Sequence, residues 1–397
     1  MSAFPRFSIL VAGVLGLFPV GHSLSAQSAL STRGLGVEIE PVDARARALG
    51  GGAVGLMDSE ISWYNTAASV GLAVPGIIFA YQYDNYESLS GGTLTHGRAA
   101  RFPLILGAFP VSERVTLTAG YGSFLDQSWR IEREDTIALA GESTVITDEI
   151  SSTGGVARLR AGVAYGLRSN LSLGLSLDSY VGEVERVQGR RFPGEGSPGC
   201  CRGSYNYSGI GYGGSFQWAP SEALTLAGSA SYGGTLKAGV VADTTGPRFD
   251  AGADRSYELP LQLRGGITGR VGQATMVTVG GGWNGWSGLD DLLAEQGGAQ
   301  DSWSGNAGAE WEGLIVRDRP VPLRVGARMG TLPFRWGDTA TAAFAEERAF
   351  SFGAGLVLAG GAARSDLAAE FGERVGDESS FSESFWRFAF SVRVLGR

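Results

Sequence analysis

Few residues of this chain have the types and spacing that catalysis requires. Covalent catalysis needs a nucleophile and a base that a third group holds in place. His96 is the one imidazole beyond the first 26 residues, and no G-x-S-x-G segment presents a nucleophilic serine. We therefore expect that the protein is not an enzyme.

The chain contains glycine motifs of the kind found in nucleotide sites, but its high glycine content explains them. A dinucleotide site needs G-x-G-x-x-G between a strand and a helix of a βαβ unit. With 63 glycines in 397 residues, chance matches are expected. The three matches are Gly50–Gly55, Gly209–Gly214 and Gly280–Gly285. We expect no bound cofactor.

Cys200 and Cys201 are the only cysteines, and they are adjacent in an expected external loop. Such a pair forms a strained bridge, pairs with another molecule, or serves as a local staple or as two ordinary thiols. The sequence leaves these alternatives open. A zinc site needs more ligands than the chain offers. Calcium is an alternative at the acidic loops Leu289–Asp291 and Asp377–Glu378, but solvated carboxylates are expected there. We expect no metal site.

Polar and apolar residues alternate along several segments. Successive side chains of a strand point to opposite faces, so such a segment has one apolar and one polar face. An arginine facing lipid at mid-membrane costs roughly 2–4 kcal/mol, so the parity predicts which face is outside. The residues expected to face lipid are Leu171, Leu173, Leu175, Leu177, Leu259, Leu261, Leu263, Ile267, Val321, Leu323, Val325, Ala327, Met329, Trp386, Phe388, Phe390, Val392 and Val394.

The polar faces supply the candidate lumen residues, which are Arg158, Arg160, Asp178, Arg264, Glu310, Arg324, Arg328, Glu370 and Arg387. Glu310 and Arg324 fall on neighbouring expected strands, and so do Glu370 and Arg387. In one interpretation, opposite charges pair across the inner wall and fix the strand register. In the other, the charges form a ladder that contacts a permeant molecule or a plug. The sequence does not separate the two.

The fourteen candidate strands are joined by connections whose lengths alternate. The short ones are Val111–Arg114, Arg168–Asn170, Ala219–Glu222, Val271–Gln273 and Gly360–Ala363. The long ones are Glu87–Gly97, Arg133–Ser151, Gln188–Ser204, Lys237–Asp254, Gly285–Asp301 and Pro333–Glu346. Tight periplasmic turns and longer outer loops are typical of outer-membrane barrels. The sequence therefore predicts an all-β protein, a 14-stranded antiparallel up-and-down transmembrane β-barrel.

Other features agree with an outer-membrane protein. Aromatic rings expected near strand ends form the girdles of such barrels: Tyr81, Tyr83, Tyr121, Trp129, Tyr165, Tyr205, Trp218, Trp303 and Trp311. No run of 18 apolar residues predicts a transmembrane helix. The net charge of −8 argues against nucleic acid as a partner.

The chain is expected to have three parts. Residues 1–26 have a basic start and a short apolar core, which predicts a signal peptide cleaved on export to the bacterial outer membrane. Fourteen strands leave room inside a barrel, and residues 27–75 contain small residues suited to fill it. We expect this segment to be an N-terminal hatch in the lumen, with an irregular lead-in as the alternative. Residues 76–397 would form the barrel.

Two segments carry a family resemblance. Ala48–Ala53 followed by Asp58–Ala67 resembles the N-terminal signature of the FadL/TodX outer-membrane transport superfamily, which includes PorV-like proteins. The usual form is Gly-Gly-Ala and later Asn-Pro-Ala; here Thr66 replaces the proline. Leu259–Gly266 and Trp286–Ser287 resemble further features of the family. The resemblance marks Gly50, Gly51, Gly52 and Asn65 as candidate hatch residues.

The resemblance implies a monomeric barrel with an internal hatch, whose relatives pass fatty acids or aromatic hydrocarbons inward, often through an opening in the wall. We expect passive uptake of hydrophobic small molecules through a polar-lined lumen, with outer-membrane lipid as surroundings. The outer loops are short and hydrophilic, which favours a PorV-like alternative: a platform for secretion-system proteins and surface attachment. A second alternative is a non-specific diffusion pore.

Overall fold

The computed structural model describes residues 28–52, 54–57, 61–90, 93–139, 142–193, 201–241, 253–294, 298–336, 344–376 and 381–396. The expected signal peptide, Cys200 and Asp377–Glu378 lie outside the described residues. Among the helices within these ranges, none is long and apolar enough to cross a membrane.

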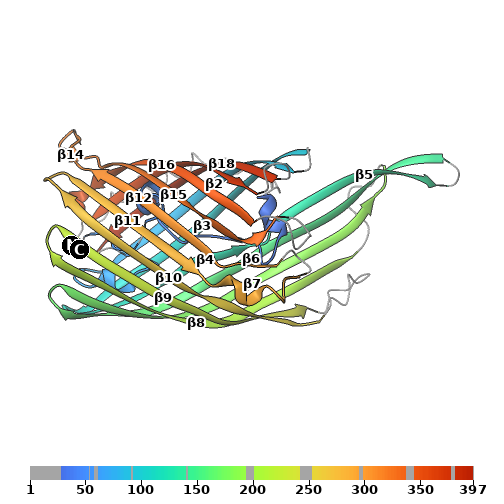
Figure 1. The fold of residues 1–397 in the computed structure, drawn as a ribbon. Coiled ribbons are helices and arrows are strands. Elements are labelled where there is room, and N and C mark those ends of the chain that lie inside the picture. The colour runs from blue at the N-terminus through green and yellow to red at the C-terminus, as the bar shows by residue number, and fades with distance from the viewer. Residues whose placement is uncertain are drawn as a thin grey trace, which may run out of the picture.

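The predicted barrel is confirmed. One antiparallel sheet contains sixteen strands, and fourteen of them, all except β1 and β5, close on themselves because β4 also pairs with β6. Figure 1 shows the strands slanting along one elongated cylinder. The barrel strands are β2 (Gly76–Ser90), β3 (Thr93–Ser112), β4 (Val115–Asp126), β6 (Glu142–Arg168), β7 (Leu171–Arg191), β8 (Arg202–Ser221), β9 (Leu224–Val241), β10 (Arg255–Val271), β11 (Thr275–Asn284), β12 (Ser302–Trp311), β15 (Leu323–Arg335), β16 (Phe344–Leu358), β17 (Ala363–Val375) and β18 (Phe381–Leu395).

The remaining elements are short. Four precede the barrel: η1 (Ala29–Thr32), β1 (Val37–Glu38), α2 (Ala44–Ala48) and η2 (Thr66–Ser69). Others lie in connections: η3 (Trp286–Leu289), β13 (Ile315–Val316), β14 (Arg319–Pro320) and η5 (Ala359–Gly361). β5 (Trp129–Leu139) pairs only with the first part of β6, and this hairpin projects from one end of the cylinder (Figure 1).

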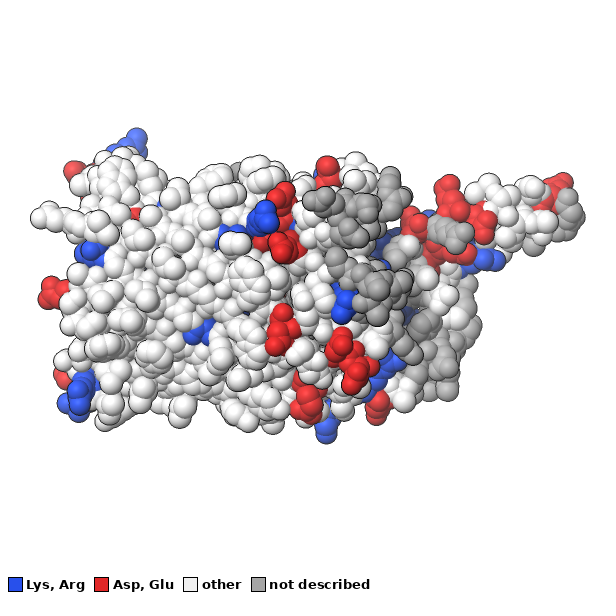
Figure 2. Space-filling view, viewed as in Figure 1, with Lys and Arg blue, Asp and Glu red and all other residues white. Residues whose placement is uncertain are grey.

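The side-chain parity expected from the sequence holds along most strands. Leu173, Leu175 and Leu177 of β7 are 44%, 65% and 56% exposed, whereas Asp178 is buried. Val325 and Met329 of β15 are likewise exposed. Figure 2 shows that the wall between the two ends carries few charged residues on the face in view, while acidic residues gather toward the end with β5. This apolar belt is what a lipid-facing wall requires.

Two residues expected on the outside face inward instead. Leu259 and Tyr205 are 2% and 8% exposed and belong to a buried apolar cluster. Pro260 has no backbone N–H for the ladder, and Gly234, the partner of Leu259 on β9, has a φ of +61°. The parity of β10 therefore changes between Leu259 and Leu261. A register shift between Gly209 and Tyr212 accompanies it on β8.

All five expected short connections are turns between consecutive strands. For two of the segments expected to be long loops, the prediction is wrong. Glu87–Gly97 is mostly strand, because β2 and β3 remain paired as far as Ser90 and Thr93. Arg133–Ser151 is mostly the β5–β6 hairpin, in which Arg133 pairs with Asp148. Both stretches lack an apolar face, so the alternation that predicts membrane strands ends before the strands themselves do.

Candidate functional site

The segment that precedes β2 packs against the inward side of the wall. α2 contacts β15, β16, β17 and β18, and all five of its residues are buried. The carboxylate of Asp43 caps the helix by accepting a hydrogen bond from the N–H of Ala46 at 2.7 Å. Ala44 and Ala48 pack on Ala368 and Ala389 of the wall. Small side chains on both sides let the helix lie close to the sheet.

Of the candidate glycines of this segment, Gly50 lies where two backbones meet and Gly52 lies against a side chain of the wall. Gly50 and Gly51 have φ values of +78° and +83°. A Cβ atom added to Gly50 would lie 2.5 Å from the carbonyl oxygen of Ala327 on β15. One added to Gly52 would lie 2.8 Å from the Asn306 Oδ1 atom on β12. Larger residues at Gly50 or Gly52 would therefore force the segment away from the wall.

Asn65, the other candidate of the segment, is fully buried. Its Nδ2 atom donates to the Gln217 Oε1 atom of β8 at 2.9 Å. The residues that follow form η2, in which the N–H of Ala67 donates to Ser215 Oγ and its carbonyl oxygen accepts from Ser172 Oγ. These bonds attach η2 to β7 and β8, about half the circumference away from α2.

Glu310 is the centre of one buried charge cluster. Its carboxylate accepts hydrogen bonds from Arg324 Nε and, at 2.6 Å, from Arg45 Nη2 of α2. Arg364 approaches it to 3.6 Å, and Arg324 also lies 2.9 Å from Asp366. Glu310 and Arg324, on neighbouring strands, therefore pair with each other and also hold the preceding segment.

Glu370 is the centre of a second cluster. Arg387 Nη1 and Arg328 Nη2 lie 2.7 Å and 3.0 Å from it. Arg328 also contacts Glu40 of the N-terminal segment at 3.3 Å, and Glu40 pairs with Arg47 of α2 at 2.7 Å. Wall and segment thus share one network of opposite charges. Some of the charges pair across the inner wall, as in the first interpretation, and others contact the segment inside the barrel, as in the second.

Trp63 is held between two arginines of β6. Arg160 donates to the carbonyl oxygen of Trp63, and its guanidinium lies 4.3 Å from the centre of the indole ring. The guanidinium of Arg158 lies 5.5 Å from the same ring. Arg160 is also bidentate to Asp178 of β7, with both contacts at 2.6 Å. Such stacking stabilises a buried cation.

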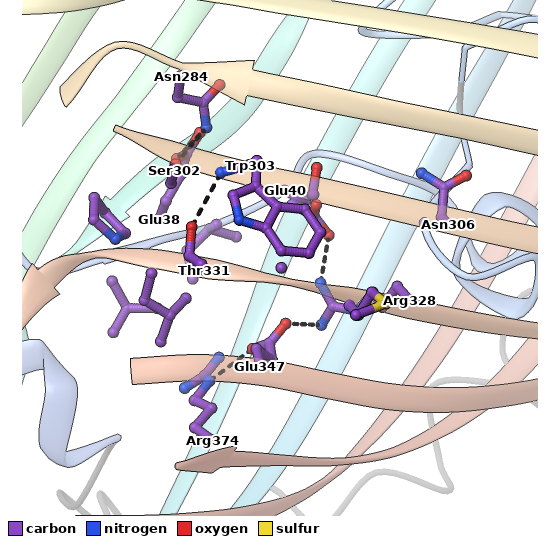
Figure 3. A pocket seen from close by; sticks show the side chains of 18 of the residues that line it. Glu38, Glu40, Asn284, Ser302, Trp303, Asn306, Arg328, Thr331, Glu347 and Arg374 are labelled. Atoms are coloured by element: carbon purple, nitrogen blue, oxygen red, sulfur yellow. Dashed lines mark hydrogen bonds and ion pairs between the residues drawn. The ribbon is translucent and has the colours of Figure 1, made fainter. Parts of the chain in front are cut away.

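A cavity of about 130 Å³ separates the N-terminal segment from β11, β12 and β15. Figure 3 shows Glu38 and Glu40 on one side and Arg328, Glu347 and Arg374 on the other. Arg328 and Arg374 lie 2.9 Å and 2.7 Å from Glu347. These charges neutralise one another and so position the N-terminal segment. None of the carboxylates in these ion pairs is left free to act as a base or a nucleophile. Within the described residues, no group of three or more His, Cys, Asp or Glu side chains could hold a metal ion.

The predicted site residues do not include the charged residues that the N-terminal segment contributes to these clusters, which are Arg45, Arg47, Glu38 and Glu40. They also omit wall residues of the same network: Asp84, Glu347, Arg374 and Glu383. Arg45 and Arg47 alternate with alanine in a segment of no evident periodicity. Glu347 and Arg374 lie outside the apolar stretches that mark the membrane, so no parity identified their faces.

The lumen is not polar throughout. At the end of the long connections, the inward faces of β6–β10 carry an apolar cluster that includes Tyr180, Tyr207 and Tyr257. η3 contributes Trp286, whose side chain is fully buried against Phe334. Leu35 of the N-terminal segment completes the cluster. The expectation of a polar lining is therefore wrong for this half, which offers an aromatic surface.

The wall is incomplete between β3 and β4. Their pairing begins at Ser112 and Val115 and ends at Leu104 and Gly122, although both strands continue. Beyond this point, Asp126 and Leu125 of β4 pair with β1 of the N-terminal segment. A cavity of about 320 Å³ lies here. Its lining includes Ala100 and Tyr121 of the wall and, from the N-terminal segment, Ile39.

Several solved structures have a similar architecture. A FadL homologue of Pseudomonas aeruginosa superposes with a TM-score of 0.61 at 12% identity, covering 90% of this chain and 99% of the other. The toluene transporter TbuX of Ralstonia pickettii gives 0.59 at 14% identity, with 90% and 99% covered. The CymD monoaromatic hydrocarbon channel gives 0.57 at 13%, with 91% and 98% covered.

No family model and no curated protein matches the sequence. Identities near 13% carry the fold and not the residues that recognise a substrate. The resemblance read from the glycine and Asn65 motifs is nevertheless confirmed at the level of architecture: this chain has the fold of the FadL/TodX outer-membrane channels.

Proposed function

We propose that the protein is a passive outer-membrane channel for hydrophobic small molecules of the hydrocarbon or fatty-acid type. The observation that carries the proposal is the gap between β3 and β4. A cavity lies at this gap. Ala100 and Tyr121 line its lipid-facing side, and the buried residues Ile39 and Leu125 line its inner side. A hydrophobic molecule can cross a wall only where strands are not hydrogen-bonded.

The apolar cluster supplies the matching inner surface. Leu125 lines the gap and belongs to the same cluster as Tyr180, Tyr207 and Trp286. A molecule that enters past η3 would exchange water for aromatic side chains, which favours apolar solutes by about 25 cal/mol per Å² of buried surface. From there the gap leads sideways to lipid. The titles of the similar structures, toluene transporter and monoaromatic hydrocarbon channel, support this class of substrate.

In this proposal the segment of residues 27–75 is the hatch. Its β1 strand lies along the gap, and its α2 helix is held by Glu310 and by the Glu370 cluster. The nine charged lumen residues then position the hatch and do not touch the substrate. No energy source is required, because transfer from water to lipid is favourable for an apolar solute.

Uptake through the gap is tested by filling it. We expect Ala100→Trp to lower the entry of labelled toluene and labelled palmitate into proteoliposomes. Ala119→Trp is the matched control, since Ala119 also faces outward but lies where β3 and β4 are paired. Equal uptake by the two variants and the parent would contradict the proposal.

Two other outcomes would identify the alternatives. Robust and unselective ion conductance in planar bilayers would indicate a diffusion pore. Co-purification with large secretion components, together with unchanged fatty-acid and toluene uptake in a deletion strain, would indicate a secretion platform.

A further inference from the structure

A further, much smaller cavity lies inside the barrel beside Tyr64 of the N-terminal segment. Its volume is about 20 Å³. Arg158 and Arg160 of β6 and Arg264 of β10 line it, together with Tyr64. A space of this size holds one particle about as large as a water molecule.

Arg158 is the unusual residue of this cavity. It is 2% exposed, and its Nε and Nη2 atoms have no hydrogen-bond partner in the described part of the chain. Its guanidinium lies over the ring of Phe124 at 4.6 Å, with Trp63 also nearby. Ring faces attract the cation but accept nothing from N–H groups at its edge. A buried charge is ordinarily paired.

Tyr180 hydrogen-bonds to Arg158, and serine side chains and Gln262 also line the cavity, but the other ionisable groups around it are only partly satisfied. Arg160 is neutralised by Asp178. Arg264 lies 4.0 Å from Glu38, and its Nε atom has no partner within the described ranges. The Oη atom of Tyr64, under the guanidinium of Arg264, is likewise without a partner there. The nearest carboxylates of these three guanidiniums are Asp178 and Glu38, while Glu40, which also acts on Arg264, is paired with Arg47 and Arg328. The unpartnered atoms of Arg158, Arg264 and Tyr64 are able to donate.

We propose that this cavity binds one small inorganic anion of the size of chloride. Such an ion accepts hydrogen bonds from Arg158, Arg264 and Tyr64 and supplies the missing negative charge. A water molecule would supply an acceptor but no charge. A carboxylate with its chain exceeds the available volume. Because Tyr64 precedes the barrel and the two arginines belong to β6 and β10, the ion ties the N-terminal segment to two separate parts of the wall.

This inference does not depend on what the channel carries, and its first test needs no variant. Crystals of the full chain, grown in detergent and soaked in sodium bromide, are measured at the bromine absorption edge. We expect an anomalous peak in contact with Arg158. It should vanish in Arg158→Gln and remain in Arg348→Gln, whose arginine side chain is 62% exposed. A parent crystal without the peak, or a peak that survives in Arg158→Gln, overturns the proposal.

A solution test uses thermal unfolding of the same protein in sodium chloride and in sodium gluconate at equal ionic strength. A ligand that binds only the folded state raises the Tm, and gluconate is too large for the cavity. We expect a higher Tm in chloride for the parent and for Arg348→Gln, and no difference between the salts for Arg158→Gln. An equal Tm of the parent in both salts contradicts the site. Stabilisation by octanoate and not by chloride would assign it to the head group of a substrate instead.

Discussion

Arg101 of β3 and Asp126 of β4 form an ion pair with an Nη2–Oδ2 distance of 3.0 Å, at a height where the two strands share no backbone hydrogen bonds. The backbone of Asp126 is paired instead with Val37 of β1. Arg101 also lies 3.5 Å from Asp84, which pairs with Arg387. The gap is therefore bridged by side chains and by the N-terminal segment, and both can separate without breaking the barrel.

Removal of this bridge should make the gap easier to cross. We expect Arg101→Gln to speed toluene entry into proteoliposomes and to lower the free energy of unfolding by about 1–3 kcal/mol, because Asp126 loses a charged partner. Arg98→Gln, an exposed position on the same strand, is the control. Slower entry in Arg101→Gln than in Arg98→Gln would show that the ion pair does not restrain the gap.

Glu310 should be needed to hold the N-terminal segment. Glu310→Gln leaves Arg45, Arg324 and Arg364 with one carboxylate fewer in a buried site, and the loss of one partner from such a pair costs about 3–5 kcal/mol. We expect a lower midpoint in urea and a higher single-channel conductance. Glu346→Gln, at a carboxylate that is 56% exposed, should change neither. Unchanged conductance in Glu310→Gln would mean that the segment does not depend on this cluster.

Glycine on β15 should be required where the segment touches it. A Cβ atom on Gly326 would collide with the backbone nitrogen of Gly50. We expect Gly326→Ala to destabilise the protein by about 1–3 kcal/mol and to make the bonds before Gly76 accessible to protease. Gly305→Ala places its methyl group in open space and is the matched control. Equal protease patterns for both variants would argue against close packing of the segment.

The lipid-facing assignment can be checked on β7. Leu175 is 65% exposed. We expect Leu175→Arg to cost about 2–4 kcal/mol if it lies near mid-membrane, with reduced heat-modifiable mobility on gels after refolding into vesicles. Leu292→Arg, in the connection after η3, should refold normally, although Leu292 is 57% exposed. Normal refolding of Leu175→Arg would place β7 outside the lipid.

The sequence predicts the wall where the ladder is unbroken. Leu173–Asp178 alternates without interruption, so counting by two gives the correct faces. The count fails at Leu259, because Pro260 interrupts the ladder and shifts the parity. It also fails where strands leave the lipid, as in Glu87–Gly97, because the outward face meets water there and the inward Ser88 is buried in polar contacts with Glu383, so neither face has to be apolar.

The candidate site could be predicted only in part, for a related reason. Glu310 and Arg324 are recognisable because adjacent strands bring them together after a short connection. The contact between Arg45 and Glu310 joins residues 265 positions apart. Nothing local in Ala44–Ala48 indicates which of the wall carboxylates its arginines meet. Which carboxylates they contact is determined only when the sheet closes, because closure brings all the inward faces around the N-terminal segment.

The ion pairs and hydrogen bonds of the first described residues imply an order of assembly. The Ser28 hydroxyl donates to Glu383 of β18 at 2.7 Å, across 355 positions, and the N–H of Ala44 donates to Ser391 across 347. These first described residues therefore cannot reach their final packing before the last hairpin of the barrel has formed. Contacts of such long range are the slowest to form. The first described stretch is thus among the last to pack, and a truncation that lacks the closing strands should leave it unanchored.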